Sequence, residues 1–404
     1  MRVTVIGGGI GGPVAAMALR RAGFEATVHE RYDRVADGTG GALSIAPNGL
    51  QALDVIGVAD AVRDIGTPMT AMAVQSWTGR TLAAFGSEPP QLLVWRGDLH
   101  RVLRETALAR GIAFEHGREL VDVADRGTHV TARFADGTGV DADLLVGADG
   151  IRSTVRRLID PAAPAPRYAG LLGFGARMAR TGEPPTGGTM RLVFGKRAFF
   201  GYQVHDDGSG GWFANLPREE PLSTAEARAT DPARWLAVLR EVFADDRTPA
   251  CRMIDRLDPA DLVVTGALED VPTVPTWSRG RVVLVGDAAH ATSPSSGQGA
   301  SLAFESAVQL ARCLRDLPHE EAFRAYERLR RTRVERIIAQ AARTNGSKAA
   351  GPVARVLRDL LMPLAVKFAD PRRFTWQFDH RIDWDDVVTA AGGGVAAAGR
   401  AVRS

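Results

Sequence analysis

An aspartate, a histidine and several serines crowd together in the stretch VLVGDAAHATSPSSGQGASL, residues 283–302. Asp287, His290 and a serine have the residue types of a nucleophilic triad. The aspartate and the histidine share one short turn, however, whereas triad members come from separate elements. The stretch also lacks the G-x-S-x-G pattern of a nucleophile elbow. We therefore interpret His290 as structural, and the small residues predict an extended ligand close to the backbone.

A glycine run near the N-terminus indicates what that ligand contains. Residues 7–12 read GGGIGG and match G-x-G-x-x-G through Gly7, Gly9 and Gly12. Gly7 permits a tight turn, Gly9 lets the backbone reach a pyrophosphate, and Gly12 lets a helix pack closely on a strand. A helix that starts here directs its first N–H groups at the phosphates. The run predicts a dinucleotide site.

The elements around the glycine run have the order that such a site requires. An apolar strand is expected over 3–6, a helix over 14–21 and a second strand over 25–29. Glu30 at the end of the second strand is placed to accept hydrogen bonds from ribose hydroxyls, and Arg31 follows it in the predicted site. A further match at 392–397 has no clear preceding strand and is rejected.

Composition restricts the class of protein. The 404 residues are 45% hydrophobic and 24% charged, which is typical of a folded chain with two or three domains. The net charge is +3 and acidic residues are interleaved with arginines, so no nucleic-acid partner is expected. The arginines at 328, 330, 331, 333 and 336 are expected on a solvated helix face. The sequence has no uninterrupted run of ~18 apolar residues, so no membrane span is expected.

The two cysteines, Cys251 and Cys313, lie far apart in the chain. They form neither a metal-ligand pattern nor a disulfide framework, which predicts a cytoplasmic protein without a metal site.

Further elements follow from hydrophobic periodicity. Helices are expected over 47–56, over 99–109 with Asp98 as the N-cap, and over 234–243, 301–314 and 320–344. Alternating strands are expected over 69–77 and 81–85, over 189–194 and 198–204, and over 211–215. The second and third groups predict an antiparallel sheet in the middle of the chain.

A third motif is LLVGADGIRSTVR at 144–156, which we call the DG motif. It stands between the glycine run and the stretch 283–302, which we call the GD motif. Together the three resemble the single-component (group A) FAD-dependent aromatic hydroxylases, the para-hydroxybenzoate hydroxylase-like flavoprotein monooxygenases. The resemblance runs from residue 3 to residue 305. It implies an α/β fold with a Rossmann-like FAD-binding domain, an inserted antiparallel substrate sheet and C-terminal helices.

The resemblance also implies domain boundaries. The FAD-binding domain would comprise 1–69, 97–166 and 275–345, and the substrate domain 70–96 and 167–274. Residues 346–404 would form a C-terminal helical segment.

The resemblance assigns roles to residues of the second and third motifs. Asp287 would bind the ribityl chain of FAD, and Asp149 would close over both FAD and the pyridine nucleotide. Arg96 would contact FAD near its phosphates. Pro294 would lie near the isoalloxazine ring. A helix would start at Gly297–Gly299, and the N–H groups of its first residues, including Ala300, would point at the flavin. The chain departs from many family members at Ser301 and at Glu305-Ser306.

The implied activity is hydroxylation or epoxidation of an aromatic or polyketide-like molecule with NADPH or NADH and O2, through a C4a-hydroperoxyflavin. Arg191, Phe200, Tyr202 and Trp212 are candidates for substrate binding, since they lie in the predicted sheet. No catalytic acid or base is named, because the flavin performs the chemistry.

Several alternatives stay open at this stage. A related flavin reductase of double bonds and a non-catalytic redox sensor share the FAD motifs. A halogenase does not fit, because its W-x-W-x-I-P segment is absent. The protein is expected to be a monomer or a homodimer.

Overall fold

The computed structural model describes residues 1–33, 40–348, 351–368 and 376–390. A parallel sheet carries the N-terminal glycine run, and its buried strands are short and apolar, as expected for a sheet covered on both faces. In spatial order the strands are β16 (Ser278–Arg279), β17 (Val282–Leu284), β10 (Leu144–Gly147), β1 (Arg2–Ile6), β2 (Glu25–His29) and β6 (Ala113–Glu115). Only β16 runs antiparallel to its neighbour.

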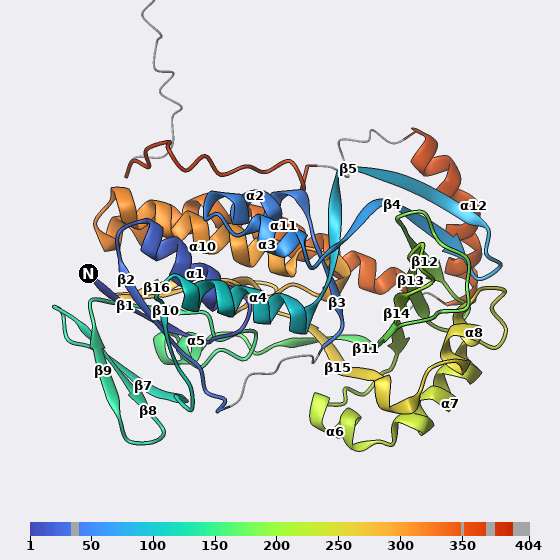
Figure 1. The fold of residues 1–404 in the computed structure, drawn as a ribbon, viewed down its shortest axis with the longest axis horizontal. Coiled ribbons are helices and arrows are strands. Elements are labelled where there is room, and N and C mark those ends of the chain that lie inside the picture. Colours follow the sequence, from blue (N-terminus) through green and yellow to red (C-terminus); the bar gives the residue numbers. More distant parts are fainter. Residues whose placement is uncertain (34–39, 349–350, 369–375, 391–404) are drawn as a thin grey trace, which may run out of the picture.

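Helices cover one face of this parallel sheet (Figure 1). Helix α1 (Gly11–Arg21) packs between α4 (Arg96–Ala109) and α10 (Gly299–Asp316), and α10 packs in turn on α11 (His319–Lys348). A smaller antiparallel sheet and a short helix pack against the same parallel sheet, at the lower left and below in Figure 1. They comprise β7 (Leu120–Asp125), β8 (Val130–Phe134), β9 (Gly139–Ala142) and α5 (Thr154–Ile159).

A larger, mostly antiparallel sheet lies beside the parallel one, to the right in Figure 1. Its strands in spatial order are β15 (Val263–Asp270), β11 (Arg167–Met178), β14 (Gly210–Pro217), β13 (Phe199–Val204), β12 (Thr189–Phe194), β4 (Thr67–Ser76), β5 (Thr81–Trp95) and β3 (Ala42–Ile45). Helices α7 (Pro232–Phe243) and α8 (Ala250–Asp255) close one face with an apolar core of their own. The other elements are α2 (Pro47–Val55), α3 (Ala59–Arg63), α6 (Thr224–Ala229), η1 (Pro259–Asp261), α9 (Asp287–His290), η2 (Pro294–Ser296) and α12 (Pro352–Phe368).

These elements confirm the mixed α/β class and most of the expected ranges. The expected N-cap at Asp98 is wrong, because α4 begins at Arg96 and Trp95 is its N-cap. Asp98 lies in the first turn instead, where an acidic side chain also stabilises a helix. The rejected glycine match at 392–397 lies outside the described residues. Among the residues that the structure describes, no helix is long and apolar enough to cross a membrane.

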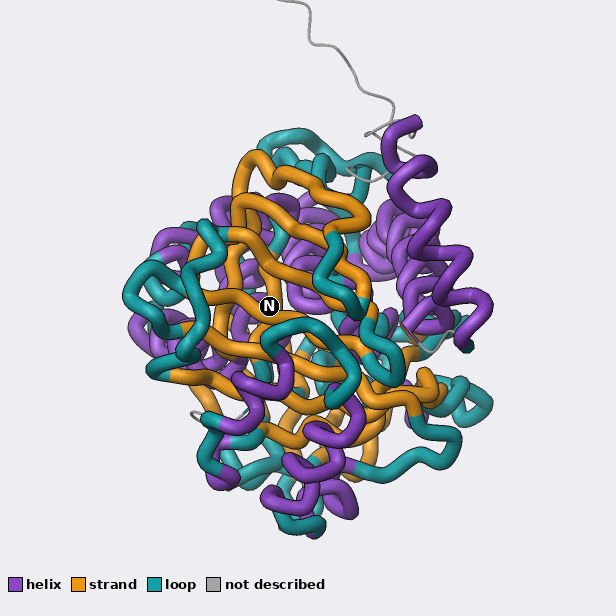
Figure 2. The backbone as a smooth tube through the Cα atoms, turned by 90° about the vertical axis from the view of Figure 1, so that its right-hand side faces the viewer, coloured by secondary structure: helices purple, strands orange, loops and turns teal. Residues whose placement is uncertain are grey.

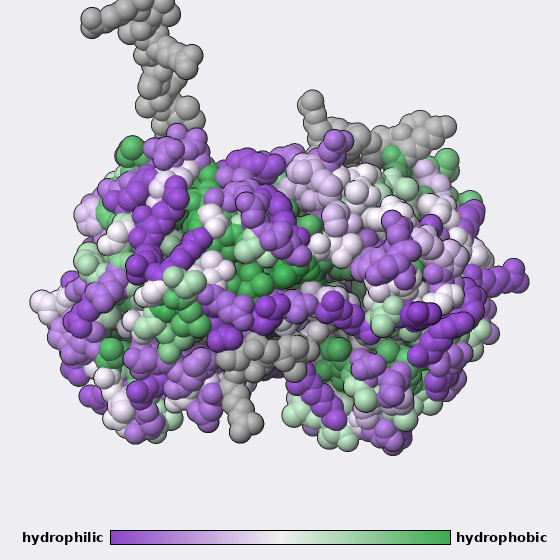
Figure 3. Space-filling view, in the orientation of Figure 1, coloured by the Kyte–Doolittle hydropathy of each residue, from purple (hydrophilic) through white to green (hydrophobic). Residues whose placement is uncertain are grey.

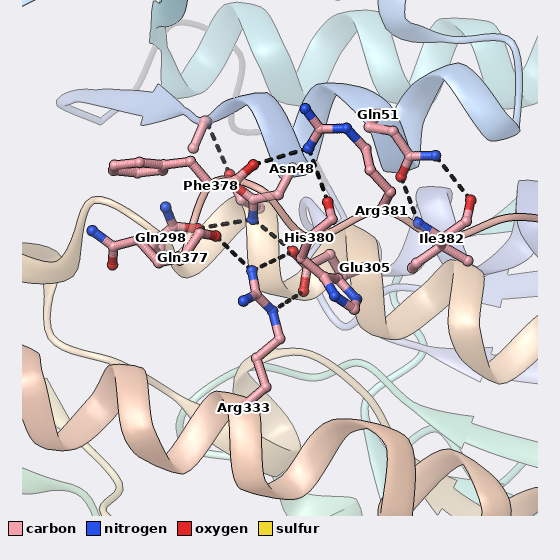
Figure 4. A network of polar contacts seen from close by, with 12 residues as sticks. Asn48, Gln51, Gln298, Glu305, Arg333, Gln377, Phe378, His380, Arg381 and Ile382 are labelled. Atoms are coloured by element: carbon pink, nitrogen blue, oxygen red, sulfur yellow. Dashed lines mark hydrogen bonds and ion pairs between the residues drawn. The ribbon is translucent and has the colours of Figure 1, made fainter. Parts of the chain in front are cut away.

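A buried carboxylate, Glu305 on α10, joins separate segments of the chain (Figure 4). Arg330 and Arg333 of α11 pair with it at N–O distances of 2.5 and 2.9 Å, and Asn48 of α2 donates to its Oε1 atom at 2.6 Å. Arg333 also donates to the carbonyl oxygen of Gln377 at 2.6 Å. Burial by itself raises the pKa of Glu305, but the two arginines outweigh burial and lower it to about 2. The ionised carboxylate thus ties α2, α10, α11 and the C-terminal segment together.

This network corrects the expectation of a solvated arginine face on α11. Arg330 is 0% exposed and Arg333 is largely covered, whereas Arg328 and Arg336 are exposed as expected. The helix pattern alone does not show that a carboxylate from α10 lies opposite two of its arginines.

Helix α12 has its polar and apolar faces in an unusual orientation. Arg355 donates to the carbonyl oxygen of Lys196 at 2.7 Å, and the Arg358 guanidinium lies 4.1 Å from the centroid of the Phe194 ring. The polar face therefore packs on the protein, and Figure 2 shows the helix upright along the side of the molecule. The apolar side chains point outward, with exposed fractions from 51% to 75%: Val353, Val356, Leu357, Leu360, Leu361 and Leu364.

Replacing Glu305 by glutamine should destabilise the protein strongly, because Arg330 and Arg333 would then be buried without a counter-charge. Breaking a buried ion pair in this way costs about 3–5 kcal/mol. Urea unfolding of the FAD-saturated variant and the wild type measures the difference. The wild-type advantage should be complete above the ordinary pKa of 4.5 and should disappear as the pH falls toward about 2, where Glu305 itself takes up a proton.

Glu327→Gln is the matched control. Glu327 pairs with Arg331 at 2.7 Å on the partly exposed side of α11, the helix that carries Arg330 and Arg333. This pair should contribute at most about 1 kcal/mol. Equal losses in the two variants would show that burial of the Glu305 network contributes nothing special.

Candidate functional site

Four loops meet at the carboxyl edge of the parallel sheet. In the strand register Ile6 pairs with both Gly147 and His29, and Gly147 pairs with Leu284. Because parallel strands end at the same edge, the glycine run, Glu30, the DG motif and the GD motif follow these residues side by side. The structure thus brings together the three motifs that are far apart in the chain.

The glycine turn after β1 has two glycines that the protein itself requires and one that faces open space. Gly7 has a φ of 106°, and a Cβ there would lie 2.6 Å from the carbonyl oxygen of Ala148. A Cβ on Gly12 would lie 1.8 Å from the oxygen of Gly7, so α1 could not start so close to β1. Around Gly9 nothing lies within 4 Å of an added Cβ. The turn therefore has room for a ligand at Gly9, as a pyrophosphate requires.

Glu30 lies directly beside this turn. Its Oε2 atom accepts from the backbone N–H of Gly8 at 2.7 Å, and its Oε1 atom accepts from that of Tyr32 at 3.0 Å. Each carboxylate oxygen keeps a further acceptor site for a hydroxyl. Arg31 is exposed and lies over the Tyr32 ring, 4.5 Å from its centroid. His100 of α4, which the sequence did not single out, contacts the oxygen of Gly8 through Nε2 at 2.9 Å.

The Asp149 side chain is used by the protein's own backbone. It accepts from the Ser153 hydroxyl at 2.5 Å and from the N–H groups of Thr154 and Val155 at 2.7 and 3.0 Å, and so holds the start of α5. Burial raises the pKa of Asp149, against the opposing effect of these hydrogen bonds. Gly150 turns the chain next to it with a φ of 80°.

Arg156 is a buried residue that sequence reasoning missed. Its Nη1 atom donates to the carbonyl oxygen of Ala288 at 3.0 Å, and its Nη2 atom donates to that of Ile151 at 2.5 Å. It therefore ties the DG motif to the GD motif. The only signal in the sequence was a charged residue in a short, otherwise mostly apolar turn of helix.

The Asp287 carboxylate opens α9 after a turn at Gly286, which has a φ of 58°. It is accessible to solvent, and among the described residues no hydrogen-bond donor reaches it. The surrounding protein nevertheless raises its pKa by desolvation, against the attraction of Arg96 and Arg156. A solvent-accessible carboxylate that no donor of the described residues reaches fits a ligand that offers hydroxyl groups. Arg96 itself is exposed beside Gly40.

The loop from Pro294 to Gly299 leads into α10. Pro294 is exposed, Gly297 adopts a left-handed conformation with a φ of 61°, and the Ser44 hydroxyl donates to the Gly297 oxygen at 3.1 Å. Helix α10 begins at Gly299, two residues before the range expected from the sequence, and Gly297 lies outside it. The N–H groups of its first turn, including that of Ala300, have no partner within the helix.

Ser301, a departure from many family members, has a local explanation. Its hydroxyl accepts from the N–H of Ala46 at 3.0 Å, and a Cβ on Gly49 would lie 2.5 Å from the same hydroxyl. The two helices α2 and α10 approach closely here, which favours small residues on both. The neighbouring departure, Ser306, bonds to His290 Nε2 at 2.7 Å.

His290 is buried, and burial lowers its pKa to about 3. Its ring packs beside Trp277, with 5.5 Å between the centroids. The imidazole is therefore neutral and enclosed, in agreement with a structural role.

The candidate substrate residues all lie toward α7 and α8. Phe200 stacks on Trp212 with 5.5 Å between ring centroids and meets Phe243 of α7 edge-on at 5.3 Å. Tyr202 belongs to the same core, and Arg191 pairs with Tyr202 across β12 and β13. The alternate residues of these strands face the other way: Phe199, Gln203, Phe213 and Asn215.

A cavity of about 410 Å³ opens elsewhere, on the outer side of α2. Figure 3 shows hydrophobic residues gathered near the middle of the molecular face seen in Figure 1. The lining of the cavity comprises mainly apolar residues of α2 and the β4–β5 region with a few charged ones at the rim: Pro47, Leu50, Pro68, Pro89, Pro90, Leu92, Gln51, Asp54, Arg63 and Arg381. None of the motif residues lines this cavity, so it is separate from the site at the sheet edge.

The open glycine turn, Glu30 beside it and the unpaired Asp287 define an FAD-binding oxidoreductase with a Rossmann-like fold. A family model described as an FAD binding domain matches residues 1–180 and 267–341. The chain belongs to the group A FAD-dependent aromatic hydroxylases, which confirms the resemblance and the expected cofactor.

Similar proteins support this membership over most of the chain. The chain is 32% identical to a 3-amino-4-hydroxybenzoate 2-monooxygenase of Streptomyces cremeus, over 85% of this chain and 86% of the relative. It is 31% identical to a 6-hydroxynicotinate 3-monooxygenase of Pseudomonas fluorescens, over 83% and 89%. The crystal structure of HpxO of Klebsiella pneumoniae, complexed with FAD and uric acid, superposes with a TM-score of 0.83 at 26% identity, over 94% and 96%.

Replacing Gly9 by valine should weaken FAD binding by about a hundredfold or more while the protein stays folded. The side chain fills the space that the pyrophosphate needs, and each lost charge-assisted hydrogen bond is worth about 1.5–3 kcal/mol. Titration of the apoprotein with FAD, followed by flavin fluorescence, measures the loss. Gly86→Val is the control, because Gly86 on β5 also has nothing within 4 Å of an added Cβ. Unchanged FAD affinity in the Gly9 variant would refute the placement.

Proposed function

We propose that this protein uses NADPH or NADH and O2 to hydroxylate an aromatic or polyketide-like small molecule. One observation carries the proposal: the loop Pro294–Gly299 follows the FAD motif at Asp287 and reaches the antiparallel sheet, where Ser295 and Asn215 share the side chain of Lys348. A ligand held at this junction would contact both this loop, which we call the flavin loop, and the sheet. When bound and reduced, FAD supplies the reaction with O2 that yields the transferred oxygen atom.

The chain's own part in this chemistry is to bind, orient and shield. The first turn of α10 directs unpaired N–H groups and the positive end of a helix of 18 residues at the Pro294 loop. Negative charge that develops on a ring placed there is stabilised without any reorganisation of the protein. Asp287 and Glu30 offer acceptors to hydroxyl groups at either end of the site.

The proposal also concerns which face of the antiparallel sheet contacts the substrate. Arg191, Phe200, Tyr202 and Trp212 remain candidates, although Phe200, Tyr202 and Trp212 belong to the apolar core that α7 and α8 cover. Phe199, Gln203, Phe213 and Asn215 lie on the face toward the flavin loop. We propose that this second set contacts the substrate.

The proposal also covers the pyridine nucleotide, the localisation and the domain boundaries. The pyridine nucleotide would bind transiently, since the described residues contain one glycine fingerprint with the required strand and helix around it. Cytoplasmic localisation agrees with two unpaired cysteines and with the need for a reduced pyridine nucleotide. The division into an FAD domain, a substrate domain and a C-terminal segment at the expected boundaries also remains a proposal.

For the quaternary structure we propose a homodimer through α12. Within its outward stripe, Val353, Leu357, Leu360 and Leu364 follow each other at spacings of four, three and four residues, which is the seam of a two-helix packing. Two copies of the stripe related by a twofold axis cover each other.

A suitable aromatic compound should accelerate NADPH or NADH oxidation by the FAD-loaded enzyme well above the rate without substrate, and one atom of labelled O2 should appear in the product. A panel built on aminohydroxybenzoates, hydroxynicotinates and urate, with polycyclic polyketides added, provides the screen. Mass spectrometry of the product reads out the label. Product formed equally well without oxygen would instead identify a reductase, and absence of both stimulation and label would favour a redox sensor.

The double variant Leu357→Glu with Leu360→Glu should be a monomer at concentrations where the wild type is a dimer, because each copy would place two charges in the seam. Light scattering on the FAD-loaded proteins determines the mass. Leu329→Glu is the control, since Leu329 is an exposed leucine of α11 outside the stripe. A monomeric wild type would refute the dimer.

A further inference from the structure

Lys348, the last residue of α11, spans the junction between the flavin loop and the substrate sheet. Its ammonium group donates to the Ser295 hydroxyl at 2.8 Å and to Asn215 Oδ1 at 2.7 Å. It also lies 4.2 Å from the centroid of the Phe199 ring. The end of α11 is anchored to the same loop, since the Ser293 hydroxyl donates to Asn345 Oδ1 at 3.1 Å. One side chain therefore contacts the loop, the sheet and an aromatic ring at once.

The surroundings of this ammonium group are neutral. Its partners are an amide, a hydroxyl and a phenyl ring, and within the described ranges no carboxylate forms an ion pair with it. Burial is the cause that lowers the pKa of Lys348 to about 7. A cation so placed is costly, because its two hydrogen bonds and the aromatic ring replace only part of its hydration and no counter-charge adds to them. An anion brought in by a ligand would supply the missing charge.

The group also has a donor to spare. An ammonium has three hydrogens, and the contacts with Ser295 and Asn215 use two of them. Lys348 is half-buried, and its third hydrogen is left for a ligand that lies between the Pro294 loop and the Asn215 face of the sheet.

We propose that Lys348 is a specificity-determining residue that binds an anionic oxygen, a carboxylate or a phenolate, on the aromatic substrate. The inference rests on the proposed function, because it takes the junction of loop and sheet as the substrate site. Lys348 selects acidic aromatic compounds over neutral compounds of the same shape, and it orients the ring by fixing one substituent at the end of α11.

Titration of the FAD-loaded enzyme with matched ligand pairs, followed by the change in flavin absorbance, tests the proposal. The carboxylate arm compares para-hydroxybenzoate with para-hydroxybenzamide, and the phenolate arm compares para-nitrophenol with para-nitroanisole. The wild type should bind the acidic member of at least one pair about tenfold more tightly than the neutral member, the gain expected of one charge-assisted hydrogen bond. The arm that shows the preference identifies the anionic group.

Lys348→Met should abolish this preference while the affinity for the neutral member and for FAD stays within about twofold. Lys348→Arg should retain part of the preference, since the charge remains. Lys196→Met is the matched control, because Lys196 lies over Trp77 next to Asp245, away from the flavin loop, and its loss should leave the preference intact.

The proposal is overturned if the wild type shows no preference for either acidic ligand, including the case in which neither binds. It is also overturned if Lys348→Met weakens acidic and neutral ligands equally or releases FAD, since Lys348 would then be only a support of the loop. Binding is measured without turnover. A failure of the oxygen-labelling experiment therefore refutes the proposed function without deciding whether Lys348 binds anions.

Discussion

The close approach of α1 to the end of β1 is the constraint on which the site depends. A side chain at Gly12 would collide with the oxygen of Gly7, and a side chain at Gly7 would collide with the backbone of the neighbouring β10 loop. Without glycine at these two positions the helix could not begin at the sheet edge, and its N–H groups would not face the open space at Gly9. The open space at Gly9, where we propose that the pyrophosphate binds, therefore follows from backbone packing.

The GD loop and α10 are held by a second layer of buried charge. Arg156 joins the DG and GD motifs through backbone oxygens, and Glu305 with Arg330 and Arg333 joins α10 to α11. Buried charges of this kind contribute to stability only when every partner is in place. The helix α11 also carries Lys348, which meets the flavin loop and the sheet.

The two faces of the antiparallel sheet have different roles. Toward α7 it presents Phe200 and Trp212 to a core of its own, which makes the sheet rigid. Toward the flavin loop it presents Phe199 and Asn215, which contact Lys348. Alternation along a strand makes such a division inevitable. Because an aromatic residue suits either face, residue type alone does not decide which face holds a substrate.

The sequence by itself determined the fold class, the family and the cofactor. Spaced glycines and short apolar strands act locally, and a G-x-G-x-x-G run between a strand and a helix has few other uses. It also predicted that Asp287 and the start of α10 belong to one site, and that His290 is structural, with which the burial of His290 agrees.

Only the tertiary structure decided the contacts between distant elements. It showed that Arg330 and Arg333 face Glu305, that Asp149 holds α5, that Phe200 and Trp212 face α7, and that Lys348 lies between Ser295 and Asn215. A charged or aromatic residue has the same helical or strand periodicity whatever lies opposite. Its role depends on which element packs against it, and this depends on the arrangement of the whole chain.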